Sequence, residues 1–174
     1  NSKKPDYYWA RARWKPRCLL ALGELHLTRG NPEAAQGFLD QAIEHGWIEK
    51  FPYKQYQVRA QRLQGTLLTA QGNLEQAETA LKRALKLARE LGSPTQLWLT
   101  EHALATLYAG LGEGNSDGNR NRNRNRNRKK AANHYQAALA TVQDIARDLT
   151  EPRLKEGFLA SAPIRQLMAQ AEQT

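Results

Sequence analysis

Apolar residues recur along most of the chain at the spacing of one helix face. Leu19, Leu22 and His26 follow this spacing near the N-terminus, and Leu104 and Leu107 follow it further along. Several of these stretches stop at a glycine, a residue that readily takes the left-handed backbone conformation found just past a helix end. The pattern therefore predicts an all-α protein.

The helical pattern repeats at an interval of 42 residues. Residues 21–43 (ALGELHLTRGNPEAAQGFLDQAI) align without a gap on residues 63–85 (LQGTLLTAQGNLEQAETALKRAL). This register indicates an internal repeat, which is typical of stacked supersecondary units. Seven of the coinciding pairs are Gly23/Gly65, Gly30/Gly72, Asn31/Asn73, Glu33/Glu75, Ala35/Ala77, Leu39/Leu81 and Ala42/Ala84.

A third copy of the repeat is present but interrupted. Its first half, with Ala105 and Gly112, follows the second copy by 40 residues. Its second half, with Ala131 and Ala138, follows by 54 residues. The difference places 14 extra residues between the two helices of this copy, within residues 113–130 (EGNSDGNRNRNRNRNRKK).

Each copy is predicted to fold as a pair of amphipathic helices. Asn31 and Asn73 stand where the second helix needs an N-cap, and an acid follows each in the first turn. Glycine inside a helix costs about 1 kcal/mol relative to alanine, so Gly23 and Gly65 indicate that a neighbouring helix comes close. The residues expected to shape the repeat by small size or turn conformation are Gly23, Gly30, Ala35, Ala42, Gly65, Gly72, Ala77, Ala84, Ala105, Gly112, Ala131 and Ala138.

The repeat resembles a known helical family. Residues 22–42 hold Leu-Gly, Gly-Asn, Ala, Leu and Ala at positions that resemble the tetratricopeptide (TPR) signature, and residues 64–85 repeat them. The interval of 42 is longer than usual, and a long second helix over residues 74–91 explains this in the second copy. Such long repeats, with the tail at residues 149–168, resemble the C-terminal arrays of large bacterial regulators, namely STAND-type ATPases and cyclase- or kinase-linked relatives.

The resemblance implies a right-handed α-solenoid of about three antiparallel helix pairs, followed by C-terminal helices. The pairs are expected at residues 16–52, 53–93 and 94–149. Residues 1–15 are interpreted as a capping segment or the end of a preceding repeat, and residues 150–174 as C-terminal capping helices. The chain lacks any motif of the ATPase, cyclase, kinase or DNA-binding parts of such regulators, so those activities are not assigned to it.

In this geometry the first helix of each pair lines a concave surface. Arg59 and Arg62 are expected to project together there beside Arg17, and guanidinium groups suit contacts with carboxylates or phosphates. We therefore expect a protein or peptide partner of acidic character. The competing interpretation is that these arginines are solvated or pair with Glu24 and Glu101. The residues expected on this face are Arg17, Leu20, Glu24, Arg59, Arg62, Thr66, Thr69, Leu99, His102 and Thr106.

The net charge of +9 is concentrated in two segments. Residues 1–17 hold six Lys/Arg and one Asp, and residues 113–130 hold seven Lys/Arg, one Glu and one Asp. The Asn-Arg repeat at residues 119–128 could contact nucleic-acid phosphates, but it lacks interleaved aromatic residues for base stacking. We interpret the insert as a disordered, solvated loop that runs into the second helix near Lys129 and Lys130.

Chemistry-bearing residues form no recognisable catalytic pattern. The acids form no paired acid/base arrangement, and the four histidines, His26, His45, His102 and His134, lack metal-ligand spacing. Cys18 is the single cysteine, which excludes an intrachain disulfide and suits a reducing compartment. No apolar run approaches the roughly 20 residues that span a bilayer. We expect no enzyme activity, no cofactor or metal, no membrane contact and a cytoplasmic location.

The sequence thus predicts a protein-interaction and regulatory scaffold. The resemblance implies that it is the C-terminal sensor region of a multidomain bacterial signalling or transcription regulator, and the absence of an initiator Met suits a piece of a longer chain. Two alternatives stay open. One is nucleic-acid binding through the two basic segments, and the other is a groove that senses a small ligand.

Overall fold

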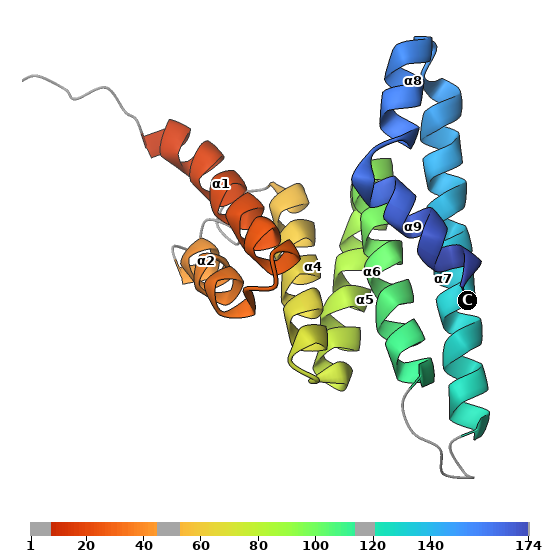
Figure 1. The fold of residues 1–174 in the computed structure, drawn as a ribbon. Helices are drawn as coiled ribbons and strands as arrows, with labels where there is room; N and C mark the ends of the chain where they lie inside the picture. The colour runs from red at the N-terminus through yellow and green to blue at the C-terminus, as the bar shows by residue number, and fades with distance from the viewer. Residues whose placement is uncertain (1–7, 45–52, 114–120, 174) are drawn as a thin grey trace, which may run out of the picture. The chain divides into compact units, whose positions relative to one another are not determined.

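The computed structural model describes residues 8–44, 53–113 and 121–173 (Figure 1). These three ranges contain eight helices and no strand. The predicted all-α class is therefore confirmed. The chain divides into two compact units, residues 1–87 and residues 88–174.

The first unit holds α1 (Tyr8–Thr28), α2 (Pro32–Glu44), α4 (Lys54–Ala70) and most of α5 (Leu74–Leu91). α1 packs on α2, and α4 packs on both. α5 has the bounds that the sequence predicts for the second helix of the second copy.

Glycine turns separate the helices of the first unit. Gly30 has a φ of 72° and Gly72 a φ of 79°, so both lie in the left-handed region that disfavours other residues. After Gly30, the backbone N–H of Asn31 donates to the carbonyl of His26 at 2.9 Å. The Asn31 side chain then caps α2, because its Oδ1 accepts a hydrogen bond from the Ala34 backbone N–H at 3.2 Å.

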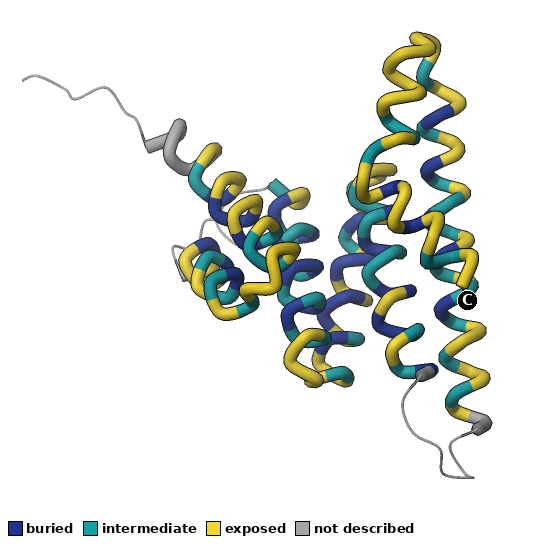
Figure 2. The backbone as a smooth tube through the Cα atoms, in the orientation of Figure 1, coloured by how far each residue is buried: buried dark blue, intermediate teal, exposed yellow. Residues whose placement is uncertain are grey.

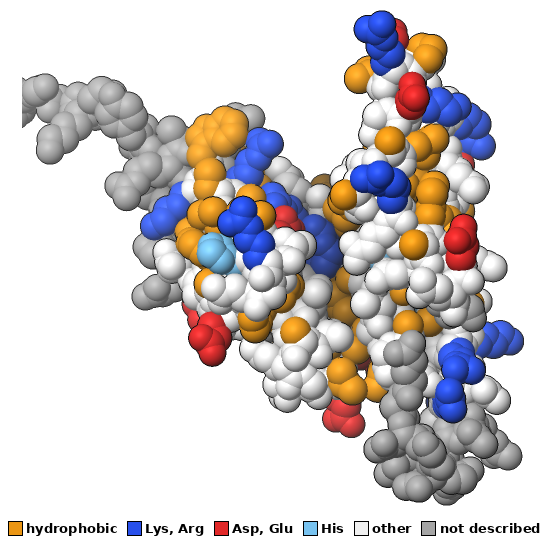
Figure 3. Space-filling view, viewed as in Figure 1, with side chains coloured by type: hydrophobic (Ala, Val, Ile, Leu, Met, Phe, Trp, Pro, Cys, Tyr) orange, Lys and Arg blue, Asp and Glu red, His pale blue; other side chains and the backbone are white. Residues whose placement is uncertain are grey.

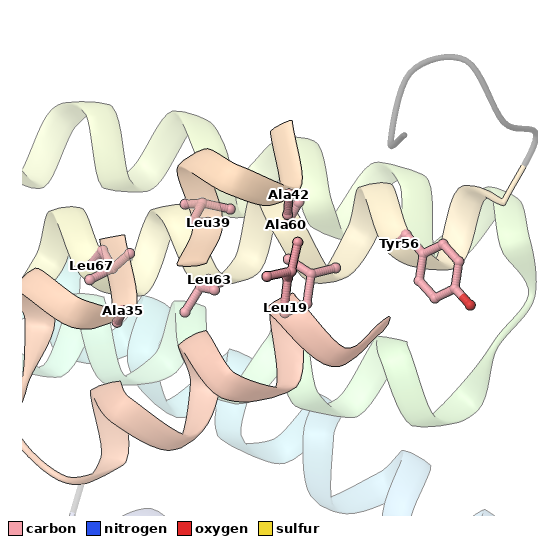
Figure 4. Packing of buried hydrophobic residues seen from close by; sticks show 9 residues of the cluster. Leu19, Ala35, Leu39, Ala42, Tyr56, Ala60, Leu63 and Leu67 are labelled. Atoms are coloured by element: carbon pink, nitrogen blue, oxygen red, sulfur yellow. The ribbon is translucent and has the colours of Figure 1, made fainter. Parts of the chain in front are cut away.

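The core of the first unit lies where α4 covers α1 and α2 (Figure 4). Its side chains are almost wholly removed from water, and fully burying one leucine contributes about 1.5–3 kcal/mol. Leu27, Phe38 and Tyr53 pack against it while staying partly exposed. The buried members are Leu19, Leu20, Ala35, Leu39, Ala42, Tyr56, Ala60, Leu63 and Leu67.

Small residues stand where the helices approach most closely. A Cβ atom on Gly23 would lie 2.7 Å from Leu63 Cδ2, and one on Gly65 would lie 2.5 Å from Leu81 Cγ. Both separations fall well inside the optimal contact of about 3.5–4.0 Å between carbon atoms. The alanines at the repeat positions are fully buried, namely Ala35, Ala42, Ala77, Ala84, Ala105, Ala131 and Ala138.

The second unit holds the end of α5, then α6 (Pro94–Glu113), α7 (Asn121–Asp148), α8 (Pro152–Leu159) and α9 (Ala162–Glu172). Gly92, with a φ of 64°, separates α5 from α6. α6 packs along α7, and α9 packs on α7 with Ile164 and Leu167 buried. Buried and exposed positions alternate along α7 with the helical period (Figure 2).

The Asn-Arg repeat is helical from Asn121 onward. The interpretation of the insert as a disordered loop is therefore wrong for residues 121–130. Arginine is a good helix former and asparagine is only moderately unfavourable, and no glycine or proline interrupts residues 121–148. As a result α7 extends over 28 residues. The remaining part of the insert, residues 114–120, lies outside the described residues.

Gly112 differs from the glycines that it matches in the repeat. Its alignment with Gly30 and Gly72 predicts a helix end, but α6 continues to Glu113. A Cβ atom on Gly112 would lie 3.0 Å from Arg128 Cγ. Gly112 therefore marks a close approach of α6 and α7, and it is not a turn residue.

The predicted boundary between residues 15 and 16 is also absent. α1 runs from Tyr8 to Thr28 without interruption, with Pro16 inside it. Residues 8–15 are thus the first turns of the same helix, and α1 crosses the predicted boundary. Residues 1–7 lie outside the described residues.

The glycine contact at Gly65 gives a test of the packing. We expect Gly65→Ala to lower the free energy of unfolding by about 1–3 kcal/mol, because the new methyl group overpacks the contact with Leu81. Gly37→Ala is the matched control, since Gly37 lies within α2 and a Cβ atom there would meet nothing within 4 Å. The control should raise stability by up to about 1 kcal/mol. Urea unfolding followed by circular dichroism measures both changes, and equal effects of the two substitutions would contradict the packing argument.

Candidate partner-binding surface

Glu24, Arg59 and Arg62 form one ion cluster in the first unit. Arg59 Nη2 donates to Glu24 Oε2 at 2.6 Å, and Arg59 Nε donates to Oε1 at 3.3 Å. Arg62 Nη2 donates to the same Oε1 at 3.1 Å. α1 supplies the carboxylate and α4 supplies both guanidinium groups, which lie one helical turn apart. The contact therefore joins the first helix pair to the second.

Two guanidinium groups share one carboxylate, so the cluster carries a net charge of +1. The Glu24 side chain is the most accessible of the three, with 35% exposed against 18% for Arg59 and 11% for Arg62. Burial lowers the pKa of Arg62 from its ordinary value, and the charge of Arg59 acts in the same direction. The Glu24 carboxylate raises this pKa through its charge and its hydrogen bond. Arginine stays charged in such surroundings, so the excess positive charge persists.

The structure brings together only part of the predicted face in this unit. The pairing of both arginines with Glu24 agrees with the competing interpretation of the sequence. Arg17 lies with its guanidinium carbon 5.3 Å from the centre of the Trp14 ring. Thr66 and Thr69 are half-buried, and their hydroxyls donate to backbone carbonyls one turn earlier in α4.

Leu20 does not belong on a binding face. Its side chain is 0% exposed and lies in the core between α1, α2 and α4. Its prediction as a partner-binding residue is wrong, because the second helix pair covers this side of α1.

The predicted residues of the second unit have partners of their own. His102 Nε2 lies 2.6 Å from Gln170 Oε1 of α9, and the Thr106 hydroxyl donates to the His102 carbonyl. Leu99 is half-buried. Burial lowers the pKa of His102, and the hydrogen bond with Gln170 partly offsets this.

A buried acid in the second unit has partners that the sequence did not predict. Glu101 is 3% exposed and binds His134 Nδ1 at 2.5 Å and Arg89 Nη2 at 3.1 Å. The His134 ring stacks on Tyr108, and the Lys130 ammonium lies 4.4 Å from the centre of the Tyr108 ring. The sequence suggests Glu101 only as a partner for the α4 arginines. No local pattern links it to His134, which lies 33 residues away on another helix.

The described arginine side chains of the Asn-Arg repeat, at positions 124, 126 and 128, do not form one stripe. Successive arginines lie two residues apart, which turns them by about 200° around a helix. Arg128 therefore approaches α6 at Gly112, and the Nε atom of Arg124 is buried. Arg126, midway between them in sequence, is exposed. This division weakens the nucleic-acid alternative, because only some of the charges can face one phosphate backbone.

A surface pocket of about 420 Å³ lies between α4 and α5 in the first unit. Ligand pockets are lined mostly by apolar side chains, whereas six of the eight residues that line this one are polar or charged. It contains no residue of the predicted binding face. The lining residues are Gln61, Gln64, Leu68, Glu75, Gln76, Thr79, Ala80 and Arg83.

Two further observations concern other chemistry. Within the described residues, no three or more His, Cys, Asp or Glu side chains gather in a way that could hold a metal ion. His45 lies outside these residues. None of the described helices has the combined length and apolar character needed to cross a membrane.

The chain matches no protein family model, no curated protein and no solved structure. Its function is therefore argued from the geometry of its own helices.

The burial of His102 predicts a pH dependence of stability. Because burial holds the pKa of His102 in the folded chain below its ordinary value of 6.5, the unfolded chain binds the proton first as the pH falls. The free energy of unfolding should therefore decrease as the pH is lowered from 7.5 through 6.5 toward 5. His102→Gln should reduce this decrease.

Urea unfolding at several pH values measures the slope. His26→Gln serves as the control for loss of a histidine elsewhere in the chain. An unchanged slope in His102→Gln would contradict the assignment to His102.

Proposed function

We propose that the chain is a TPR-like interaction scaffold whose antiparallel helix pairs stack as a solenoid. Three observations support this proposal. The helices follow the internal repeat, glycine turns join the two helices in each of the first two pairs, and small residues mark the close contacts. Such arrays present extended surfaces to protein partners. The wider proposal places the chain at the C-terminal end of a multidomain bacterial regulator.

The binding site that we propose is the cluster of Glu24, Arg59 and Arg62. Its excess positive charge suits an acidic segment of a protein partner. The cluster also joins two helix pairs, so a ligand there contacts both. The single observation that carries the proposal is that two guanidinium groups converge on one partly exposed carboxylate.

In this proposal a partner carboxylate takes the place of Glu24. A free carboxylate reaches the arginines once the Glu24 side chain turns away toward solvent, a movement that its exposure allows. Glu24 then competes with the partner carboxylate for the two arginines and lowers the apparent affinity of the site. This interaction is electrostatic and weakens as the salt concentration rises.

Replacement of Glu24 tests this competition directly. We expect Glu24→Gln to tighten binding of a fluorescein-labelled hexaglutamate peptide by about tenfold, since the neutral amide no longer competes for both arginines. Arg59→Gln should weaken binding by a similar factor. Fluorescence anisotropy at low ionic strength measures both affinities.

Charge-matched controls separate the site from the overall charge. Glu33→Gln removes an exposed carboxylate of α2, and Arg153→Gln removes an exposed guanidinium group of α8. Each changes the net charge as the matching site substitution does. If the controls shift the affinity as much as Glu24→Gln and Arg59→Gln, the cluster is not the binding site.

A further inference from the structure

α1 carries an apolar stripe on its outer side. Trp14, Cys18, Ala21 and Leu25 are spaced by four, three and four residues, which places them on one face of the helix. Trp14 is 52% exposed and Leu25 is 42% exposed, and Cys18 and Ala21 are exposed too. Hydrophobic side chains reach the surface over α1 among lysine and arginine side chains (Figure 3). Exposed apolar side chains gathered on one helix face are typical of an interaction surface.

The internal repeat shows what such a stripe does elsewhere in the chain. A shift of 42 residues carries the four positions onto α4, and every one of them is buried there. The α4 residues are Tyr56, Ala60, Leu63 and Leu67, exposed by 7%, 3%, 2% and 0%. All four belong to the core in Figure 4.

The surface under the α4 stripe has a defined composition. Leu63 lies over Gly23, which leaves room for it because it lacks a side chain. Ala35, Leu39 and Ala42 of α2 form the rest of this surface. We use the term seat for this surface of α1 and α2, formed by Leu20, Gly23, Ala35, Leu39 and Ala42.

A charged contact accompanies the apolar one. The shift of 42 residues also carries Arg17 onto Arg59, which pairs with Glu24 of the preceding pair. The described residues include no helix pair before α1, so Arg17 has no equivalent acid to meet there. Its guanidinium group lies over Trp14 instead. Arg17 is therefore placed to meet a carboxylate of another helix pair, as Arg59 meets Glu24.

We propose that the α1 stripe docks on a further helix pair with the same kind of seat. This partner helix pair carries small residues at the positions that correspond to Gly23, Ala35 and Ala42. It carries a carboxylate at the position of Glu24, which takes the guanidinium group of Arg17. This assignment goes beyond the binding of acidic segments at Arg59 and Arg62, because it concerns a different face of α1 and a structured partner.

A second copy of the chain is not this partner. The seat on α1 and α2 of each copy is already covered by its own α4. In the second unit α9 packs on α7 and reaches His102, which the repeat register aligns with Leu20 of the seat. The matching surfaces of the first and third copies are therefore filled within one chain. The aligned residues of the second copy, Gly65, Ala77, Leu81 and Ala84, are buried as well.

Cys18 provides a direct probe of the docked state, because it lies in the stripe and is the only cysteine. The test adds a second copy of residues 1–42 in front of residue 1 of the full chain, which keeps the repeat interval. The added copy carries Cys18→Ser, so that one thiol remains. Maleimide labelling of this thiol should slow by about tenfold or more, because a thiol under a packed helix reacts only when the contact opens.

Variants of the added copy define the contact. Ala35→Asp with Leu39→Asp in the added copy should restore the labelling rate of the original chain. Glu24→Gln in the added copy should restore it in part, and Glu33→Gln there should leave the protection intact. Circular dichroism and an unfolding curve of each fusion verify that the original chain is folded in it.

Two results would overturn the proposal. One is a labelling rate that is the same in the original chain, the fusion and the Ala35→Asp/Leu39→Asp fusion. The other is protection of Cys18 in the original chain that grows with protein concentration together with a dimer mass in sedimentation, which would make a second copy the partner. The hexaglutamate assay measures the Arg59 site separately, so either proposal can fail without the other.

Discussion

The close approach of neighbouring helices at glycine is the constraint on which the packing of the first unit depends. Leu63 occupies the space above Gly23, and Leu81 occupies the space above Gly65. A larger side chain at either position would push the helices apart and open the core around them. The glycines cost helix propensity, and the burial of the leucines that they admit offsets this cost.

The same geometry places charge at the joint between helix pairs. Leu20 is buried because α4 covers it, while Glu24, one turn later on α1, meets Arg59 and Arg62 at the edge of that contact. A carboxylate at this edge stays partly hydrated, so its ion pairs avoid the full desolvation penalty of a buried bridge. Glu101 represents the opposite situation. It is buried, and a histidine and an arginine each contact one of its carboxylate oxygens.

Equivalent positions in the repeat differ in what covers them. Tyr56 and Leu67 of α4 lie in the core, whereas Trp14 and Leu25 at the same register lie on the surface of α1. The difference does not come from residue type, because all four side chains are large and apolar. It comes from the presence of a preceding helix pair under α4. The same apolar register is therefore covered in one repeat and exposed in another.

The sequence by itself determined the helical class, the bounds of α5 and the positions of the small residues, because helical periodicity, glycine turns and caps are local properties. It misjudged the Asn-Arg repeat, where composition suggested a loop but helix propensity without glycine or proline extends α7. Only the tertiary structure decided that Gly112 lies in a helix contact, that Leu20 is core and that Glu101 meets His134. These outcomes depend on which helix covers which face, and a local pattern cannot specify contacts between residues that are far apart in the chain.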